Sequence, residues 1–371
     1  PSLGTVFEWY GFYLYGSLAA VIAKQFFAGL DPTSAFIFAL LAFSAGFIVR
    51  PLGALVFGSI GDKVGRKYTF LVTIVIMGLS TFLVGLLPGY EAWGVISPVI
   101  LILLRMLQGL ALGGEYGGAA TYVAEHAPRN RRGYYTSWIQ TTATMGLFLS
   151  LIVILIVQSY VNGNYAPVPQ FSGGEPLLGP DGQQVLLEPF KAWGWRIPFI
   201  ASLALVVVGL WVRVTVAETP AFKKAAESDT LARVPLVELL KSEWKHVLLG
   251  AGVMMLQYTL FYTATTYCLS YGTKVLGIPQ QDMLLMTLLA VLALAAGTIA
   301  SAVLSDRLGR KKVLVAGAAA GIVWGLVMFP LINTEIYFLV WLALAGALGR
   351  GWPTASAGSS AAHCRRSSRP T

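Results

Sequence analysis

The stretch Gly61-Asp62-Lys63-Val64-Gly65-Arg66-Lys67 occurs a second time, in related form, as Ser305-Asp306-Arg307-Leu308-Gly309-Arg310-Lys311. Both copies run from a small residue through aspartate, a basic residue, an aliphatic residue and glycine to arginine and lysine, and each lies between two long apolar runs. A single Asp–Gly–basic turn is common, but two copies at equivalent places indicate a repeat on the scale of half the protein. The sequence therefore predicts two related halves, each with one copy as a loop between two helices.

The composition is that of a membrane protein. Hydrophobic residues make up 56% of the 371 residues and charged residues only 12%, whereas about 25% of an ordinary soluble domain is charged. The net charge of +9 would suit a nucleic-acid partner in a soluble protein. Here the basic residues gather in a few loops beside apolar runs, as the positive-inside rule expects. We therefore predict an all-α integral membrane protein in contact with the lipid bilayer, with no nucleic-acid partner.

A helix needs about 20 predominantly apolar residues to cross a bilayer, and the chain offers about nine such runs and part of a tenth. The nine runs are Leu3–Phe27, Ser34–Phe57, Tyr68–Leu87, Ile96–Ala119, Tyr135–Val157, Ile197–Val216, Val247–Tyr271, Met283–Val303 and Val313–Ile332, and the partial run covers 336–348. If the first run crosses outward, the outer side holds only the bases Lys24, Lys191, Arg196 and Lys274. The loops on the other side, including both repeated stretches, then hold most of the basic residues. Because cytoplasmic loops carry the excess of lysine and arginine, this predicts that both repeated stretches are cytoplasmic.

The runs divide the chain into parts. We expect an N-terminal six-helix half at 1–216, a cytoplasmic linker at 217–246 and an incomplete C-terminal half at 247–349. Residues 158–193 form a Gly- and Pro-rich outer-loop insertion, for which a small hairpin cap and an unstructured segment both remain open. Residues 350–371 have no apolar periodicity. We interpret this aberrant non-membrane tail, and the start at Pro1, as signs of a truncated chain.

A charge inside a predicted span costs about 2.5–3.5 kcal/mol on insertion scales and needs a reason. For Arg50, in the second span, we favour a structural role, in which the side chain reaches toward the interface or pairs with a carboxylate. Glu8 shares a helical face with Phe12 and Tyr15, which is suitable for a buried proton carrier, although solvation at the cytoplasmic end is the alternative. Arg105 and Glu115 both lie in the fourth span. They stand about 15 Å apart along the helix axis. Each therefore needs a partner on another helix or on substrate, and we predict a function for both.

A set of polar side chains within the spans suggests a water-accessible central path, although such hydroxyls often bond only to their own helix backbone. The predicted cavity residues are Tyr15, Gln108, Gln140, Thr144, Gln257, Tyr258, Tyr262 and Thr265. The sequence contains no Gly-rich phosphate loop, zinc-ligand spacing or nucleophile–base pair. Cys268 and Cys364 are far apart in sequence. We therefore expect no enzyme activity, catalytic residue, cofactor or metal site.

The repeated stretches resemble the signature of the major facilitator superfamily, which has two six-helix halves. Several motifs are more narrowly similar to its metabolite:proton symporter family, which includes permeases for α-ketoglutarate, citrate, shikimate, proline and betaine. These motifs are Glu8-Trp9-Tyr10, Arg50-Pro51-Leu52-Gly53, Gly113-Gly114-Glu115-Tyr116-Gly117-Gly118, Ala124-Glu125-His126-Ala127-Pro128, Trp193-Gly194-Trp195-Arg196-Ile197-Pro198-Phe199 and Glu218-Thr219-Pro220. A further motif, Arg105-x-x-Gln108-Gly109, resembles the fourth-span motif of the superfamily as a whole.

The resemblance implies roles for particular residues. It implies proton coupling through Glu8, Arg105 and Glu115, and an inner gate that opens and closes with the two repeats. The gate residues would be Gly61, Asp62, Gly65, Arg66, Lys67, Asp306, Gly309, Arg310 and Lys311. Two departures matter: Gly11 stands where the family usually has aspartate, and the eleventh span, which receives the aspartate of the first repeat, is absent.

We therefore expect a multi-pass protein of the cytoplasmic (inner) membrane, acting as a monomer. It would be a proton-coupled symporter that imports a small polar metabolite, an organic acid or a zwitterionic osmolyte, by alternating access. The alternatives are a proton-linked exporter of drugs or metabolites, a non-transporting membrane sensor or scaffold, and an inactive gene fragment.

Overall fold

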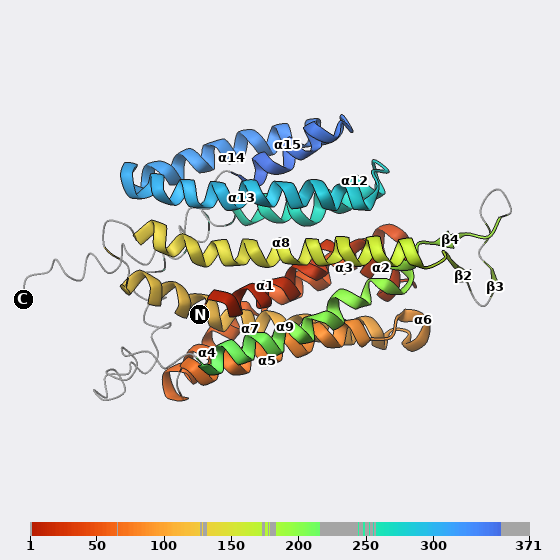
Figure 1. Cartoon of the computed structure of the whole chain (residues 1–371), viewed down its shortest axis with the longest axis horizontal. Coiled ribbons are helices and arrows are strands. Elements are labelled where there is room, and N and C mark those ends of the chain that lie inside the picture. The colour runs from red at the N-terminus through yellow and green to blue at the C-terminus, as the bar shows by residue number, and fades with distance from the viewer. Residues whose placement is uncertain are drawn as a thin grey trace, which may run out of the picture.

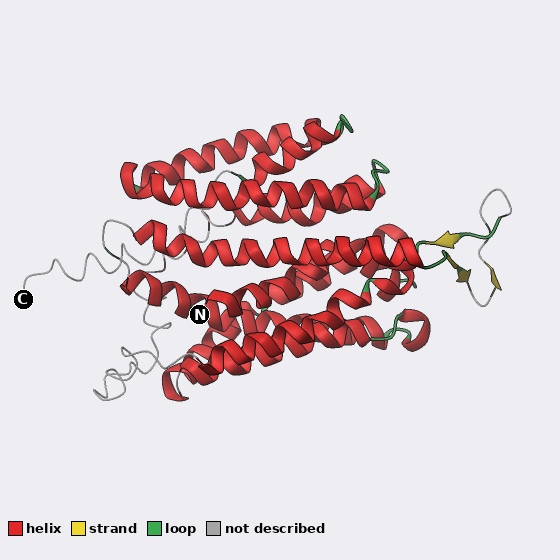
Figure 2. Cartoon of the chain, viewed as in Figure 1, coloured by secondary structure: helices red, strands yellow, loops and turns green. Residues whose placement is uncertain are grey.

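The computed structural model is a bundle of long helices that run side by side (Figures 1 and 2). It describes residues 2–64, 66–126, 128, 132–172, 175–176, 178, 183–215 and 257–349, together with the single positions 244, 248, 252 and 255. The predicted linker at 217–246, apart from position 244, and the predicted tail at 350–371 lie outside these residues. We call residues 2–215 the first part and residues 257–349 the second part.

The helices of the first part follow the predicted spans, with two interruptions. The first span is divided at Leu18, and the second is divided at Val49 just before Pro51. Proline has no backbone N–H and favours the first turn of a helix, so Pro51 explains the second break. The helices are α1 (Ser2–Ser17), α2 (Ala19–Phe26), α3 (Pro32–Ile48), α4 (Arg50–Val64), α5 (Arg66–Leu86), α6 (Tyr90–Trp93), α7 (Ile96–His126), α8 (Arg132–Asn164) and α9 (Arg196–Thr215).

Asp31 fixes the start of α3. Its carboxylate accepts hydrogen bonds from the backbone N–H groups of Thr33 at 3.2 Å and Ser34 at 3.0 Å. Pro32 occupies the first helical position, where a missing N–H costs nothing. These are the ordinary elements of a helix N-cap, and they satisfy donors that the helix itself leaves unpaired.

The insertion after α8 forms short antiparallel pairs of strands, as one of the two open interpretations predicted. Strand β1 (Val168–Pro169) pairs with β4 (Leu186–Leu187), and β2 (Phe171–Ser172) pairs with β3 (Glu175–Pro176). They project beyond the end of α8 (Figure 2). A π-helical segment, η2 (Phe190–Gly194), then leads into α9. We call this the hairpin end of the bundle and the opposite end the repeat end.

The second part begins in the seventh span with helical residues 257–262, followed by a π-helical segment, η3 (Thr263–Tyr267), which continues directly into α12 (Cys268–Lys274). Three longer helices follow: α13 (Gln280–Leu308), α14 (Arg310–Ile332) and α15 (Tyr337–Leu348). Helix α15 is the partial tenth span of the sequence prediction. Helices α13 and α15 lie against each other, and α14 lies against α15.

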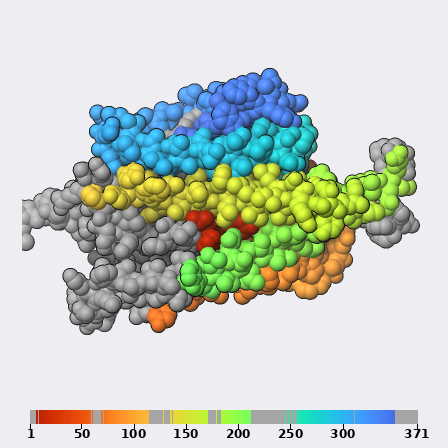
Figure 3. All heavy atoms as spheres, in the orientation of Figure 1, coloured from red at the N-terminus to blue at the C-terminus, as the bar shows by residue number. Residues whose placement is uncertain are grey.

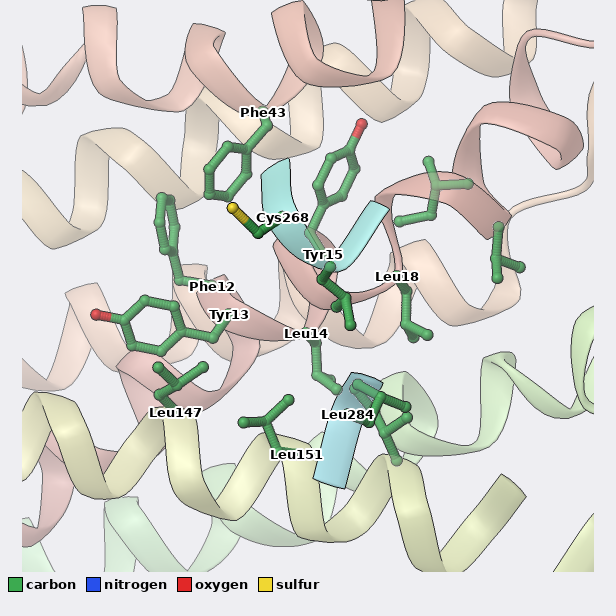
Figure 4. Close-up of a cluster of buried hydrophobic side chains, with 14 of the residues drawn as sticks. Phe12, Tyr13, Leu14, Tyr15, Leu18, Phe43, Leu147, Leu151, Cys268 and Leu284 are labelled. Carbon is green, nitrogen blue, oxygen red and sulfur yellow. The ribbon is translucent and has the colours of Figure 1, made fainter. Parts of the chain in front are cut away.

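The two parts meet along α8 and α13, which lie side by side (Figures 1 and 3). Helix α1 lies against α8 on the other side and contributes a continuous row of buried side chains. Figure 4 shows Leu14 of α1 between Leu147 and Leu151 of α8 and Leu284 of α13. All four of these leucines are fully or almost fully buried. The contact between the parts is therefore apolar along this side.

Five of the described helical segments are long and apolar enough to cross a membrane by length and composition. They are Pro32–Gly58, Ile96–Gly113, Ser137–Asn164, Gln280–Leu308 and Lys311–Ile332, and shorter apolar helices occur at Leu71–Leu86, Arg196–Trp211 and Tyr337–Leu348. Many large apolar side chains of these helices face outward, among them Ile48 (76% exposed) and Leu326 (76% exposed). Such a surface matches hydrocarbon and does not match water.

The repeated stretches are not the loops that the sequence predicted. The first copy is the last turn of α4 and the first turn of α5, separated by position 65. In the second copy, Asp306 lies in the last turn of α13, and α14 begins at Arg310. Gly309 alone joins these two helices, with a φ of +94° that side-chain-bearing residues rarely adopt. The second copy is therefore a helix–glycine–helix junction, and the first copy spans the end of α4 and the start of α5.

Candidate functional site

Arg105 lies in α7 with only 1% of its surface exposed. Its guanidinium carbon is 3.8 Å from the centroid of the Tyr15 ring, and its Nη2 donates to the backbone oxygen of Phe12 at 3.4 Å. Its Nη1 donates to Oε1 of Gln108, and Gln108 Nε2 in turn donates to Oγ1 of Thr81 at 2.9 Å. Arg105, Tyr15 and Gln108, all predicted from the sequence, therefore lie together, held by cation–π contact and hydrogen bonds.

Arg50 lies in an aromatic cage at the junction of α3 and α4. Its guanidinium carbon is 4.2 Å from the Phe47 ring centroid, 4.5 Å from that of Phe12 and 5.6 Å from that of Trp9. Its Nε and Nη2 atoms are buried and have no hydrogen-bond partner among the described residues. The sequence had favoured a structural Arg50 that reaches toward the interface or pairs with a carboxylate, and the described residues show neither arrangement.

The second part completes this cage through Tyr262. The Tyr262 ring lies 5.0 Å from that of Phe47 and 5.7 Å from that of Phe43, both on α3. Its hydroxyl is buried and interacts with the side chain of Arg50, although the two groups do not form a well-aligned hydrogen bond. Tyr258 stacks on Tyr262 at 6.2 Å. Two residues of the predicted cavity thus reach across from the second part to a cation of the first.

Arg50 and Arg105 share the Phe12 ring and repel each other electrostatically. Among the described residues, neither arginine lies within ion-pair distance of a carboxylate. The ion pair found among those residues joins Lys191 and Glu188, at the hairpin end. Two buried guanidinium groups beside one ring give this place a positive electrostatic character.

Close contact between helices brings the two arginines together. A Cβ atom on Gly109 of α7 would collide with the backbone oxygen of Gly46 on α3, and one on Gly113 would collide with the backbone oxygen of Arg50. Glycines four residues apart lie on one helix face, so α7 presents a flat strip to α3 and α4.

The other predicted cavity residues are less directly connected to this site. Gln140, Thr144 and Thr265 are buried, and Gln257 is partly exposed. The Thr144 hydroxyl donates to Gln140 O at 3.1 Å and the Thr265 hydroxyl to Phe261 O at 2.8 Å, each within its own helix. These two hydroxyls therefore follow the simpler alternative that the sequence left open.

Several predicted site residues lie partly or wholly outside the described residues. Glu8 belongs to α1 and Glu115 to α7, but their side chains are outside the described part of the chain. The same holds for the side chains of Asp62, Arg66, Lys67 and Arg310 and for positions Gly61 and Gly65. Lys311 is exposed at the start of α14. Their predicted roles in proton coupling and gating remain predictions.

Asp306 of the second repeat makes a contact between the two parts. Its Oδ2 atom accepts a hydrogen bond from the backbone N–H of Tyr134 at 3.0 Å. Tyr134 is the third residue of α8, where the N–H has no partner within the helix. A negative charge there is also favoured by the helix dipole. The aspartate of one repeat thus caps a helix of the other part.

Sequence reasoning missed the cage residues Trp9, Phe43 and Phe47 and the partner Thr81, and it placed Phe12 beside Glu8 and not beside Arg50. Aromatic residues in a span are usually packing residues, so their type alone gave no signal. One signal was present: Arg50 is a charged residue inside a predicted span, which by itself indicates a functional site.

The arrangement of the helices is that of a known class of membrane transporter. The chain superimposes on the xylose transporter XylE of Escherichia coli, in a partially occluded inward-open conformation, with a TM-score of 0.71 and 16% identity. The superposition covers 97% of this chain and 85% of that one. The fold is therefore that of the major facilitator superfamily, as the sequence predicted.

Sequence comparisons place the chain more narrowly. Residues 1–234 and 224–350 match the family described as "Sugar (and other) transporter", and the chain belongs to it. It is 36% identical to the inner membrane metabolite transport protein YhjE of Escherichia coli (strain K12), over 92% of this chain and 74% of that protein. It is 34% identical to the glycine betaine/proline/ectoine/pipecolic acid transporter OusA of Dickeya dadantii (strain 3937), over 92% of this chain and 66% of OusA.

These findings confirm a multi-pass membrane protein from a family of transporters and not of enzymes. The chain spans about two thirds to three quarters of the length of these two relatives.

Proposed function

We propose that the protein is a proton-coupled symporter of the inner membrane that imports a small polar metabolite, an organic acid or a zwitterionic osmolyte, by alternating access. The observation that carries this proposal is the pair of buried cations, Arg50 and Arg105, at the place where Tyr262 of the second part meets the first part. A site between two halves is accessible from alternate sides when the halves rock about it. The names of the relatives support a small-molecule substrate.

The carboxylate of a substrate would bind the Nε and Nη2 donors of Arg50 and the hydroxyl of Tyr262, in place of their contact with each other. Charge-assisted hydrogen bonds of this kind are about twice as strong as neutral ones. The aromatic rings around Arg50 would face the apolar or cationic remainder of the molecule, since their π faces attract both.

Proton coupling needs a group that alternates between charged and neutral forms. Glu115 or Glu8 is the proposed carrier, and Arg105 would hold the deprotonated carboxylate until a proton replaces it. The contact of Asp306 with Tyr134 would fasten the repeat end in one state and release it in the other.

Uptake into proteoliposomes tests this proposal. An inward proton gradient should drive accumulation of a labelled organic acid or osmolyte, and a protonophore should abolish it. The variant Glu115→Gln should lose gradient-driven accumulation while reconstituting normally. Accumulation by this variant equal to that of the unmodified protein would contradict the role of Glu115.

The same vesicles separate the alternatives. Gradient-driven extrusion in place of accumulation would identify an exporter, and no movement of any solute in either direction would favour a sensor or an inactive protein.

A further inference from the structure

A second candidate site lies at the hairpin end, away from Arg50 and Arg105. A cavity of about 910 Å³ opens there between the two parts. The first part contributes α2, the loop around Gly89, α8, the strands β1 and β4, and η2, and the second part contributes α12 and the start of α13. We call this cavity the vestibule.

The bases of the vestibule are the ones that the sequence had placed on the outer side of the membrane. Lys24, Lys191, Arg196 and Lys274 all line the cavity, and its acidic lining residues are Glu91 and Glu188. The four cations come from α2, η2, α9 and α12. The vestibule thus has an excess of positive charge, which raises the local concentration of anions.

Two of these cations have no counter-charge among the residues that the structure describes. Lys191 is paired with Glu188 at 2.8 Å, and Arg196 donates to the backbone oxygen of Leu87 at 3.4 Å. Lys24 and Lys274 have no carboxylate within ion-pair distance among the described residues, and Lys24 repels Lys274 electrostatically. They belong to opposite parts of the protein, so an anion between them would relieve this repulsion and bridge the two parts.

An unpaired acceptor adds a second requirement. Gln158 of α8 lines the vestibule with 3% of its surface exposed, and its Oε1 atom has no hydrogen-bond donor among the described residues. A buried amide oxygen without a donor costs free energy, which a ligand can recover by donating to it. A ligand that satisfies the vestibule therefore carries both a negative charge and an O–H or N–H group.

We propose that the vestibule binds a small carboxylate that also carries an O–H or N–H donor, with the carboxylate between Lys24 and Lys274 and the donor on Gln158. This site is distinct from the one at Arg50. Binding at this site does not rest on the proposed import function. A hydroxy acid or an amino acid meets both requirements, whereas a betaine has no donor for Gln158.

Three small probes separate these requirements: lactate, its methyl ether 2-methoxypropionate, and its neutral amide lactamide. Binding is measured by saturation-transfer NMR on the whole chain in nanodiscs of zwitterionic lipid, without a proton gradient. We expect lactate to bind, lactamide not to bind, and 2-methoxypropionate to bind more weakly than lactate. Added salt should weaken lactate binding, because the site is open to solvent.

Variants then locate the site. Removing one unit charge near the ligand should weaken lactate binding about fivefold, so Lys24→Gln and Lys274→Gln should each have this effect, and the double variant a larger one. Lys312→Gln, an exposed cation at the repeat end, is the matched control and should bind normally. Gln158→Met should remove the preference for lactate over its methyl ether.

The proposal is overturned if the double variant binds lactate as tightly as the unmodified protein, or if lactamide binds as tightly as lactate. Binding without gradient-driven uptake would sustain the vestibule and contradict the transport function. Gradient-driven uptake without lactate binding would contradict the vestibule site and support the transport function.

Discussion

At the scale of the residue, the aromatic side chains around Arg50 and Arg105 determine the character of the centre. Each guanidinium lies on ring faces from α1 and α3, and the ring of Phe12 serves both. A guanidinium is planar and stacks on such rings, whereas an ammonium is a compact, strongly hydrated point charge. Lysine is therefore no conservative replacement at either position.

Replacing Arg105 by lysine should reduce uptake at least tenfold. The variant keeps the charge but loses the stacking on Tyr15 and the fork of donors, and a desolvated cation–π contact alone contributes about 2 kcal/mol. Initial rates in proteoliposomes measure the effect. The matched control is Lys312→Arg at the exposed start of α14, which should transport normally. Equal rates for Arg105→Lys and the unmodified protein would contradict this prediction.

The cap at Asp31 predicts a pH dependence outside the membrane. Hydrogen bonds from Ser34 and Thr33 hold the pKa of Asp31 below its usual value of 3.8. Folding therefore favours the charged form. The contribution of the Asp31 carboxylate to stability is complete above the pKa that Asp31 has in the unfolded chain. It is lost as the pH falls through the lower pKa that Asp31 has in the folded protein.

The variant Asp31→Ala should accordingly melt at a lower temperature than the unmodified protein at pH 7, and the difference should shrink below pH 3.8. Thermal unfolding of the purified protein in detergent at both pH values checks this. A difference in melting temperature that is the same at the two pH values would argue against the cap.

At the scale of the element, apolar length predicted the helices well, because a span is a long signal with a fixed requirement. The interruptions at Leu18 and Val49 and the π-helical turns are irregularities of a few residues that leave the average hydropathy unchanged. Of these irregularities, only the break at Val49 has a signal in the sequence, which is Pro51. The helical nature of the repeated stretches was missed for a related reason, since a single glycine is enough to separate two helices.

The approach of α7 to α3 can be tested with alanine. Gly109→Ala should destabilise the protein strongly, because the added methyl group meets the backbone oxygen of Gly46, which has no flexible side chain to move aside. Overpacking of this kind typically costs about 1–3 kcal/mol. Thermal unfolding in detergent gives the measurement.

The control is Gly317→Ala in α14, where the added methyl group meets no atom within 4 Å. It should leave the protein unchanged or stabilise it by up to about 1 kcal/mol, because alanine favours helix more than glycine does. Similar melting temperatures for the two variants would show that α7 and α3 are not in close contact.

At the scale of the whole molecule, the sequence indicated two related halves and the superfamily, since the repeat and the apolar runs are both visible without structure. It could not show that Arg50 faces Tyr262 or that Asp306 caps α8, because those contacts join residues far apart in the chain. The central site was therefore predicted in part: Arg105, Tyr15, Gln108, Tyr258 and Tyr262 were expected from their types. The rings that Trp9, Phe43 and Phe47 add around the two arginines were not expected.

The contact between Asp306 and Tyr134 predicts a change in amide hydrogen exchange. In Asp306→Ala, the Tyr134 amide should exchange faster, because its acceptor is gone. In Asp306→Asn, exchange should stay closer to normal, since the side-chain oxygen still accepts. The Leu147 amide, further along α8, serves as the internal control. Unchanged exchange at Tyr134 in the alanine variant would rule out the contact in the membrane.

The π-helical turn η3 separates the ring of Tyr262 from Lys274 within a single span. Such a turn holds one residue more than an α-helical turn, so the segments before and after it have different rotational settings. Because of this extra residue, the seventh span contains a turn that can shift its position along the helix. If the surplus residue passes along the helix, the side chains that it crosses rotate while both ends of the span stay in place. One span can thus present Tyr262 to the cage and Lys274 to the vestibule in settings that a continuous α-helix would not combine.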